Sequence, residues 1–342
     1  MTEHSPTAHG DMAHCKAAIK HGSHSFYAAS HLLPAAVRDP ALALYAFCRL
    51  ADDEVDLKAD KIRAAADLMN RVDLVYKGTP RNTPTDRAFA QMVDAVNMPH
   101  TLPEALLEGL AWDAQERRYD TLDDLYAYAA RVASAVGAMM CVIMKAHEPH
   151  VIARACDLGV AMQLTNMARD IGEDALEGRL YIPLDWLDEA GIDPEAFLAQ
   201  PTPRMAIKRA AQRMLTAADG LYSKSNSGIA HLPLRCRGGV YAARYIYAAI
   251  GTDIARFDYD SVTRRARTTR RQKLGLLGRS TLHTALSAVM PRSAMVYAPP
   301  LPQTQFLVDA VKEQHTTTPD WSDHFISIMS QLKSQDALNM RP

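Results

Sequence analysis

Acidic side chains crowd the end of the stretch YAFCRLADDEVD, residues 45–56, which is otherwise apolar and favours a helix. Residues four apart lie on one face of a helix, so Asp52 and Asp56 point the same way, with Asp53 beside them and Arg49 one turn earlier. Carboxylates this close repel one another and need either open water or a cation. Alone, the stretch also fits a solvated helix face with a local ion pair.

A second stretch, QLTNMARDIGEDALEGRLYIP at residues 163–183, favours the cation. Asn166, Asp170 and Asp174 follow at four-residue steps, and Arg169 stands next to Asp170. Amide and carboxylate oxygens are hard ligands that suit Mg²⁺, with Mn²⁺ as an alternative. Arginine adds bidentate contacts to phosphate oxygens. Two such helices in one helical chain predict a site for a magnesium-bridged diphosphate.

The composition is that of a soluble globular protein. The chain has 342 residues, of which 48% are hydrophobic and 23% charged, and a formal net charge of −1, which gives no support to bulk nucleic-acid binding. Its five cysteines are scattered and never in CxxC spacing, which predicts reduced thiols and no zinc site. The longest nearly apolar run, 132–144, is too short to cross a bilayer, and no secretory signal is seen. We therefore expect a cytoplasmic protein.

Sparse glycine and recurring three- and four-residue periods predict an all-α fold. The chain reads as one domain, 1–290, with a partly irregular C-terminal extension, 291–342. A basic run, RRARTTRRQK, occupies residues 264–273. Helices are predicted at 11–31, 41–75, 85–97, 103–118, 122–146, 149–176, 203–230 and 238–256, with short helices at 305–313 and 323–332.

Five segments together resemble the squalene and phytoene synthase family, the head-to-head isoprenoid synthases, and most of all its bacterial phytoene synthases. They read GSHSFYAASHLLP, LALYAFCRLADDEVD, YAARVASAVG, QLTNMARDIGEDALEGRLYIP and YDSVTRRAR, and they span most of the chain. The resemblance implies an isoprenoid-synthase helical bundle with two acidic helices facing each other across a central apolar cavity.

By matched motif position, the resemblance also implies roles for individual residues. The implied metal ligands are Asp52, Asp53, Asp56, Asn166, Asp170 and Asp174. The implied catalytic set is Tyr45, Arg49, Asp52, Asp56, Asp170 and Asp174. The implied substrate-binding set is Ser23, Ser25, Phe26, Tyr128, Gln163, Arg169, Arg179, Tyr247 and Arg264.

Several of these residues have structural alternatives. The two serines could cap a helix, Tyr128 and Tyr247 could be core residues, and Arg179 could complement a helix C-terminus. The basic run could be a solvated surface or one that faces anionic lipid. In the predicted helix 122–146, small residues could leave room for a polyprenyl chain or allow close helix packing.

The implied reaction is a Mg²⁺-dependent condensation of two geranylgeranyl diphosphates to phytoene in carotenoid biosynthesis. It passes through a cyclopropyl diphosphate, prephytoene diphosphate, and needs no NADPH. Squalene or dehydrosqualene synthesis from farnesyl diphosphate is the alternative. A non-enzymatic isoprenoid carrier is a further alternative, although a carrier has no need of two acidic motifs. Because the substrate and product are oily, transient contact with the inner face of the membrane is expected without an anchor. The sequence makes no prediction of oligomeric state.

Overall fold

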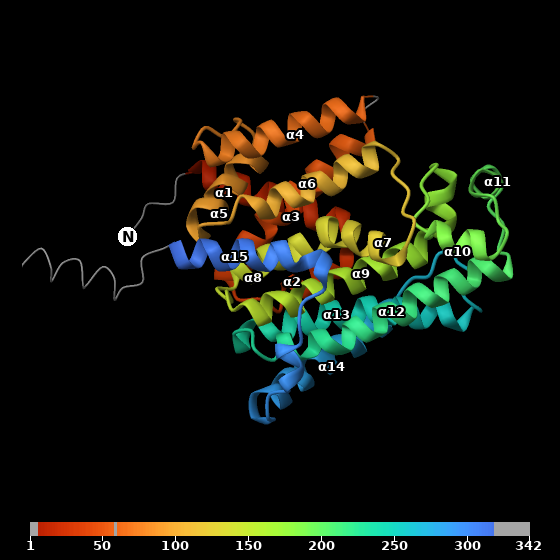
Figure 1. The fold of residues 1–342 in the computed structure, drawn as a ribbon. Helices are drawn as coiled ribbons and strands as arrows, with labels where there is room; N and C mark the ends of the chain where they lie inside the picture. The colour runs from red at the N-terminus through yellow and green to blue at the C-terminus, as the bar shows by residue number, and fades with distance from the viewer. Residues whose placement is uncertain (1–5, 58–59, 318–342) are drawn as a thin grey trace, which may run out of the picture.

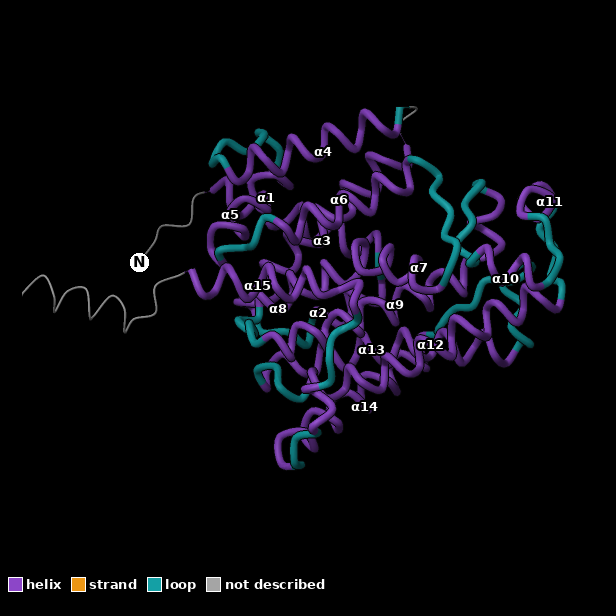
Figure 2. Tube along the Cα trace, in the orientation of Figure 1, coloured by secondary structure: helices purple, strands orange, loops and turns teal. Residues whose placement is uncertain are grey.

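The structure, a computed structural model, describes residues 6–57 and 60–317, and within these ranges it contains helices and no strand (Figure 2). The predicted all-α fold is confirmed. The α-helices are Pro6–Gly22 (α1), His24–Ser30 (α2), Ala35–Leu57 (α3), Lys61–Tyr76 (α4), Pro84–Val96 (α5), Thr101–Ala114 (α6), Leu122–Ala129 (α7), Ala135–Ile143 (α8), Pro149–Leu176 (α9), Leu184–Glu189 (α10), Pro194–Ala199 (α11), Met205–Ile229 (α12), Leu234–Arg256 (α13), Arg270–Val289 (α14) and Gln305–Thr317 (α15). A π-helical turn, Ala130–Ser134 (η1), joins α7 to α8, and two 3₁₀ turns, Ala294–Tyr297 (η2) and Pro302–Thr304 (η3), precede α15.

Helix α9 is the central element of the bundle (Figure 1). It begins with a proline at its first position, where no backbone donor is lost, and it packs against α12, α13, α8 and η1. Gly159 allows α9 to approach η1 closely, because a Cβ there would lie 2.6 Å from Cα of Ser134. The two apolar core clusters meet along this helix, so its polar side chains are held between them.

Two predicted helices are each divided in the structure. The predicted helix 11–31 is α1 and α2, because Ser23 leaves the helical conformation and caps α2 by accepting from the Phe26 amide. The predicted helix 41–75 is α3 and α4, and Asp60 caps α4. Helices α10, α11 and α14 were not predicted; α14 begins at a capping box of Thr269 and Gln272. The predicted helix 323–332 lies outside the described residues.

The helical stretch from α7 to α8 is long and apolar enough to cross a membrane, and 56% of it is buried inside the bundle. Its middle is the π-helical turn η1, where the Ser134 hydroxyl donates to the Cys156 carbonyl at 2.8 Å. Such turns are frequent at functional sites because they redirect side chains. Here the turn lies beside the polar part of α9.

The described part of the C-terminal extension, 291–317, packs on the bundle. Leu307, Val308 and Val311 of α15 belong to the same apolar core as α3 and α8. Buried Arg154 donates to the carbonyls of Met295 and Ala298, both at 3.0 Å. This segment therefore shares the core of the bundle, and the boundary at residue 290 stays a prediction from sequence.

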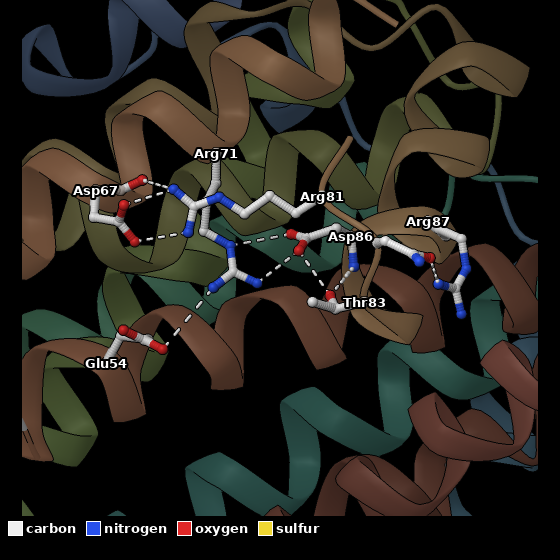
Figure 3. A network of polar contacts seen from close by, with 8 residues as sticks. Glu54, Asp67, Arg71, Arg81, Thr83, Asp86 and Arg87 are labelled. Carbon is white, nitrogen blue, oxygen red and sulfur yellow. Dashed lines mark hydrogen bonds and ion pairs between the residues drawn. The ribbon is translucent and has the colours of Figure 1, made fainter. Parts of the chain in front are cut away.

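A polar network anchors the acidic end of α3 to its neighbours (Figure 3). Buried Asp86 on α5 accepts from Arg71 on α4 at 2.7 Å and from the Thr83 hydroxyl at 2.7 Å. Arg71 also reaches Glu54 on α3, at 3.9 Å. Glu54 thus differs from the other acidic residues of its stretch, because it faces this network and not the cavity described below.

Candidate active site

Two joined cavities lie between α3, α6, η1 and α9. The polar one, about 360 Å³, is lined by side chains of both acidic stretches. The apolar one, about 370 Å³, continues from it between α2, α8, α9 and α13. Tyr45, Cys48, Val132, Val136, Gln163 and Asn166 line both. The polar cavity is thus a charged chamber that opens into an apolar chamber.

The first acidic stretch reaches the polar cavity through Tyr45, Arg49 and Asp52. Arg49 pairs with Asp52 at 3.3 Å and with Asp53 at 2.5 Å. The carboxyls of Asp53 and Asp56 are about two-fifths exposed and do not line the cavity wall. Of the three carboxyls only that of Asp52 lines the cavity wall, although its side chain is 48% exposed.

The second acidic stretch lines the opposite wall with residues of every turn of α9 from 163 to 174. They are Gln163, Asn166, Met167, Arg169, Asp170 and Asp174. Asp170 accepts from Arg169 at 2.7 Å and pairs with Arg265 at 2.9 Å. Arg265 also pairs with Glu173, at 2.7 Å.

Arg179 joins the two walls, because it follows α9 and pairs with Asp56 of α3 at 2.9 Å. The negative charge is nevertheless incompletely balanced. Burial, together with the charge of Asp170, raises the pKa of Asp174 to about 8. Burial and the neighbouring Asp56 also raise the pKa of Asp52. Without a cation, Asp174 tends to keep its proton at neutral pH, and Asp52 holds its proton more tightly than an exposed aspartate does.

The oxygen set fits a hard divalent cation. The Asn166 side-chain oxygen is buried at the junction of the two cavities without a hydrogen-bond partner. Burial and neighbouring carboxylates raise the pKa values of Asp52 and Asp174, although Arg179 lowers both. Within 6–57 and 60–317, no three His, Cys, Asp or Glu side chains already form a metal cluster.

Asp113 and Tyr181 also line the polar cavity, and sequence reasoning had assigned no role to either. Asp113 on α6 accepts from the hydroxyls of Tyr128 and Tyr181, both at 2.8 Å. Burial raises the pKa of Asp113 to about 6, and the two phenols oppose that rise. The only available signal was Tyr181 within the LYIP end of the second stretch, because Asp113 has no carboxylate four residues before or after it and so forms no DxxxD pattern.

Aromatic rings stand where the two cavities meet. Phe26 of α2 packs on Tyr247 of α13, with ring centroids 5.4 Å apart, and meets Tyr45 edge-on at 6.4 Å. Burial raises the pKa of Tyr247 to about 12. Below them the apolar cavity is lined by Ala133, Gly137 and Met140 from the predicted helix 122–146. The small side chains thus border open space, and Gly159 shows that close packing occurs on the same surface.

Three predicted substrate-binding residues lie elsewhere. Ser23 is the α2 cap, and neither it nor Ser25 lines either cavity. Arg264 pairs with Asp253 at 3.5 Å and stacks on the Phe257 ring, 3.1 Å from its centroid. Its neighbour Arg265 reaches the acidic helix instead, because consecutive residues of a non-helical segment point to different sides.

The loop that carries Arg265 is held against α9 at a glycine. The Gly172 amide donates to the Ser261 carbonyl at 3.0 Å. A Cβ on Gly172 would lie 2.8 Å from Cα of Val262, so this position has no room for a side chain. The glycine between Asp170 and Asp174 therefore brings the late basic segment to the acidic one.

Comparisons with known proteins agree with this arrangement. The sequence profile of the squalene/phytoene synthase family matches residues 19–272. A phytoene synthase from Rhodobacter capsulatus is 52% identical over 332 residues, which cover 96% of this chain and 98% of that protein. A phytoene synthase from Cereibacter sphaeroides is 53% identical over 339 residues, which cover 96% and 95%.

Solved structures of related enzymes have the same fold. A dehydrosqualene synthase in complex with a ligand superposes with a TM-score of 0.75 at 27% identity, covering 82% of this chain and 98% of that one. A squalene synthase from Alicyclobacillus acidocaldarius gives a TM-score of 0.68 at 24% identity, covering 74% and 95%, and shows the fold alone. The matched segment contains both acidic stretches and nearly all residues of the joined cavities. The chain therefore belongs to the squalene/phytoene synthase family.

Proposed function

We propose that this protein is a phytoene synthase, a prenyltransferase of carotenoid biosynthesis that joins two geranylgeranyl diphosphates to form 15-cis-phytoene. The observation that carries the proposal is the joining of a carboxylate- and arginine-lined chamber to a long apolar one. Identities of 52% and 53% to phytoene synthases, against 27% to a dehydrosqualene synthase, favour the forty-carbon product.

The carboxylates of both walls and the Asn166 oxygen would hold Mg²⁺, with Mn²⁺ as a substitute. When bound, the cation supplies Lewis-acid neutralisation of the diphosphate's charge as the allylic C–O bond breaks. The pKa values of Asp52 and Asp174, which burial raises most and neighbouring carboxylates raise further, support this assignment, because a divalent cation would stabilise the ionised forms.

The arginines would bind the diphosphate. Arg49, Arg169 and Arg179 line the same chamber, and in the unliganded protein their guanidinium groups pair with Asp52, Asp170 and Asp56. Substrate phosphates can take over these contacts when cations occupy the carboxylates. Both the donors and the counter-charges are therefore already in position before the substrate enters.

The apolar chamber would protect the allylic cation. Its walls are mainly aliphatic, small or aromatic, and they would exclude water that otherwise quenches the cation as an alcohol. The faces of Phe26 and Tyr247 at the junction offer electron density to positive charge. The double bond of the second geranylgeranyl diphosphate attacks the cation, and loss of a proton closes the three-membered ring of the cyclopropyl diphosphate, prephytoene diphosphate. Its ionisation, rearrangement and proton loss complete the reaction with no hydride donor.

The final proton would leave toward the polar chamber. Released diphosphate is the base nearest the reacting carbons in this scheme. The hydrogen-bonded group of Asp113, Tyr128 and Tyr181 borders the same space and can accept a proton through water.

The five cysteines are free thiols, which supports a reducing, cytoplasmic compartment.

The test is incubation of the purified protein with geranylgeranyl diphosphate and, separately, farnesyl diphosphate, with Mg²⁺ and without NADPH. Phytoene should be the main hydrocarbon product, and Asp170→Asn should form none while keeping the wild-type circular dichroism spectrum. Faster conversion of farnesyl diphosphate to a thirty-carbon hydrocarbon would reassign the substrate. A requirement for NADPH would refute the proposed termination by proton loss.

A further inference from the structure

Helix α14 presents an apolar face to solvent at the edge of the bundle, where its main neighbour is α13 (Figure 1). Leu274, Leu282 and Val289 are 68%, 62% and 80% exposed and lie on one side of the helix, together with Leu286. Of the fourteen large hydrophobic side chains exposed in the described structure, seven fall between 274 and 297. Four of these seven, Leu274, Leu282, Leu286 and Val289, share one face of α14, and such a concentration marks an interaction surface.

The charge around this face has one sign. Residues 261–308 contain eight arginines and lysines and no aspartate or glutamate. Arg264 and Arg265 pair with carboxylates, and no carboxylate within 60–317 or 6–57 lies within ion-pair distance of the other six. Those six are Arg267, Arg270, Arg271, Lys273, Arg279 and Arg292. Arg279 stacks on Tyr245, and the others are at the two ends of the apolar face.

The opposite side of α14 is anchored on α13 by aromatic and polar contacts. Tyr241 stacks on His283 with ring centroids 4.4 Å apart, and Arg237 donates to the Ser287 carbonyl at 2.9 Å. The buried Ser280 lies on this anchored side. Polar contacts thus hold the helix on α13 and direct its aliphatic side chains outward.

Only α13 separates this face from the apolar cavity. Val240, Ala243 and Tyr247 of α13 line the cavity, while Tyr241 and Tyr245 of the same helix contact α14. The cavity and the exposed face therefore lie on opposite sides of one helix.

We propose that the outer face of α14, defined by Leu274, Leu282, Leu286 and Val289 with the basic residues at its ends, docks this protein on a bilayer of anionic phospholipid. Aliphatic side chains enter the acyl boundary, and arginines and lysines contact phosphate head groups. Charge complementarity selects the anionic bilayer over a neutral one. A second copy of this chain would bring the same positive charges together, which disfavours it as the occupant.

The docking is tested by sedimentation of the full chain with vesicles and without substrate, so the result does not depend on the proposed reaction. Vesicles contain phosphatidylcholine alone or with one-third phosphatidylglycerol. The protein should sediment with the anionic vesicles, and raised salt should release most of it. Leu282→Gln/Val289→Gln should lower the partition coefficient at least about tenfold, because each aliphatic side chain contributes that much when transferred from water.

Matched controls separate the surface from general hydrophobicity. Ile62→Gln/Met205→Gln removes two equally exposed aliphatic side chains, at 66% and 59%, from α4 and α12 and should leave vesicle binding unchanged. Arg270→Gln/Arg271→Gln should weaken binding to anionic vesicles and reduce its salt dependence. All variants should keep the wild-type melting temperature, since the changed side chains are exposed.

Three results would overturn the proposal. The first is failure of the full chain to bind anionic vesicles. The second is equal loss of binding in the α14 variant and its control. The third is an α14 variant that binds vesicles normally but changes from dimer to monomer in sedimentation velocity, which would make the face a contact between copies.

Discussion

Asp174→Asn should stabilise the metal-free protein and at the same time abolish its function. The pKa of Asp174 is raised from 3.8 to about 8, mainly by burial and then by the charge of Asp170. The folded state therefore keeps this proton up to about pH 8, whereas the unfolded chain releases it near pH 4. Asparagine has the same shape and carries no charge to desolvate.

The size of the effect follows from linkage. The folded pKa is the higher one, so wild-type stability falls as pH rises between the two values, and the variant is spared this loss. The pH of 7 lies about three units above the pKa of this carboxyl in the unfolded chain. This difference corresponds to a loss of about 4 kcal/mol in the free energy of unfolding. Solvent reaches part of the carboxyl, so we expect about 2 kcal/mol at pH 7 and less than about 1 kcal/mol at pH 5.

The assay is chemical denaturation at pH 5 and pH 7 without divalent metal, followed by the same measurement with Mg²⁺. Mg²⁺ should stabilise the wild type at pH 7 and stabilise the variant much less. The exposed carboxylate Asp188 supplies the control, because Asp188→Asn should change neither value. The reasoning would be refuted by a variant that is no more stable than the wild type at pH 7. It would also be refuted by a variant whose gain in the free energy of unfolding is the same at pH 5 and pH 7.

Three further changes test other parts of the site. Asp113→Asn should lower kcat at least about tenfold with little change in KM, because it removes the charged acceptor of two phenol hydroxyls; a wild-type kcat would remove Asp113 from the mechanism. Gly172→Ala should destabilise the protein by about 2 kcal/mol or more, since its Cβ meets the Val262 backbone, and thermal denaturation would show this; an unchanged melting temperature would show that the loop yields. Arg71→Gln should cost about 3–5 kcal/mol in urea denaturation, because buried Asp86 loses its partner; a loss below about 1 kcal/mol would contradict a buried ion pair.

The local part of the architecture was predictable from sequence. The predicted helix 149–176 coincides with α9, because its apolar period persists for about eight turns between Pro149 and Gly178. The spacing of Asp170 and Asp174 placed both on one helical face, and the structure puts both on the cavity wall. Their roles as metal ligands remain predictions.

Helix boundaries were less predictable where a polar residue could either continue a helix or cap the next one. Ser23 and Asp60 divide two predicted helices because each side chain accepts from a backbone amide three residues later. Neither residue type forbids a helix interior, and tertiary packing decides which conformation is adopted.

The amino-acid sequence by itself determined that this protein is helical and where its acidic faces lie, because residues three and four apart meet on any helix. Its motifs also determined which family it resembles. Only the tertiary structure decided that Asp113 receives two tyrosine hydroxyls, that Arg265 and not Arg264 meets Asp170, and that α14 turns its aliphatic side outward. Each of these contacts joins segments far apart in the chain, and their meeting depends on how helices pack around a shared core, which no local spacing encodes.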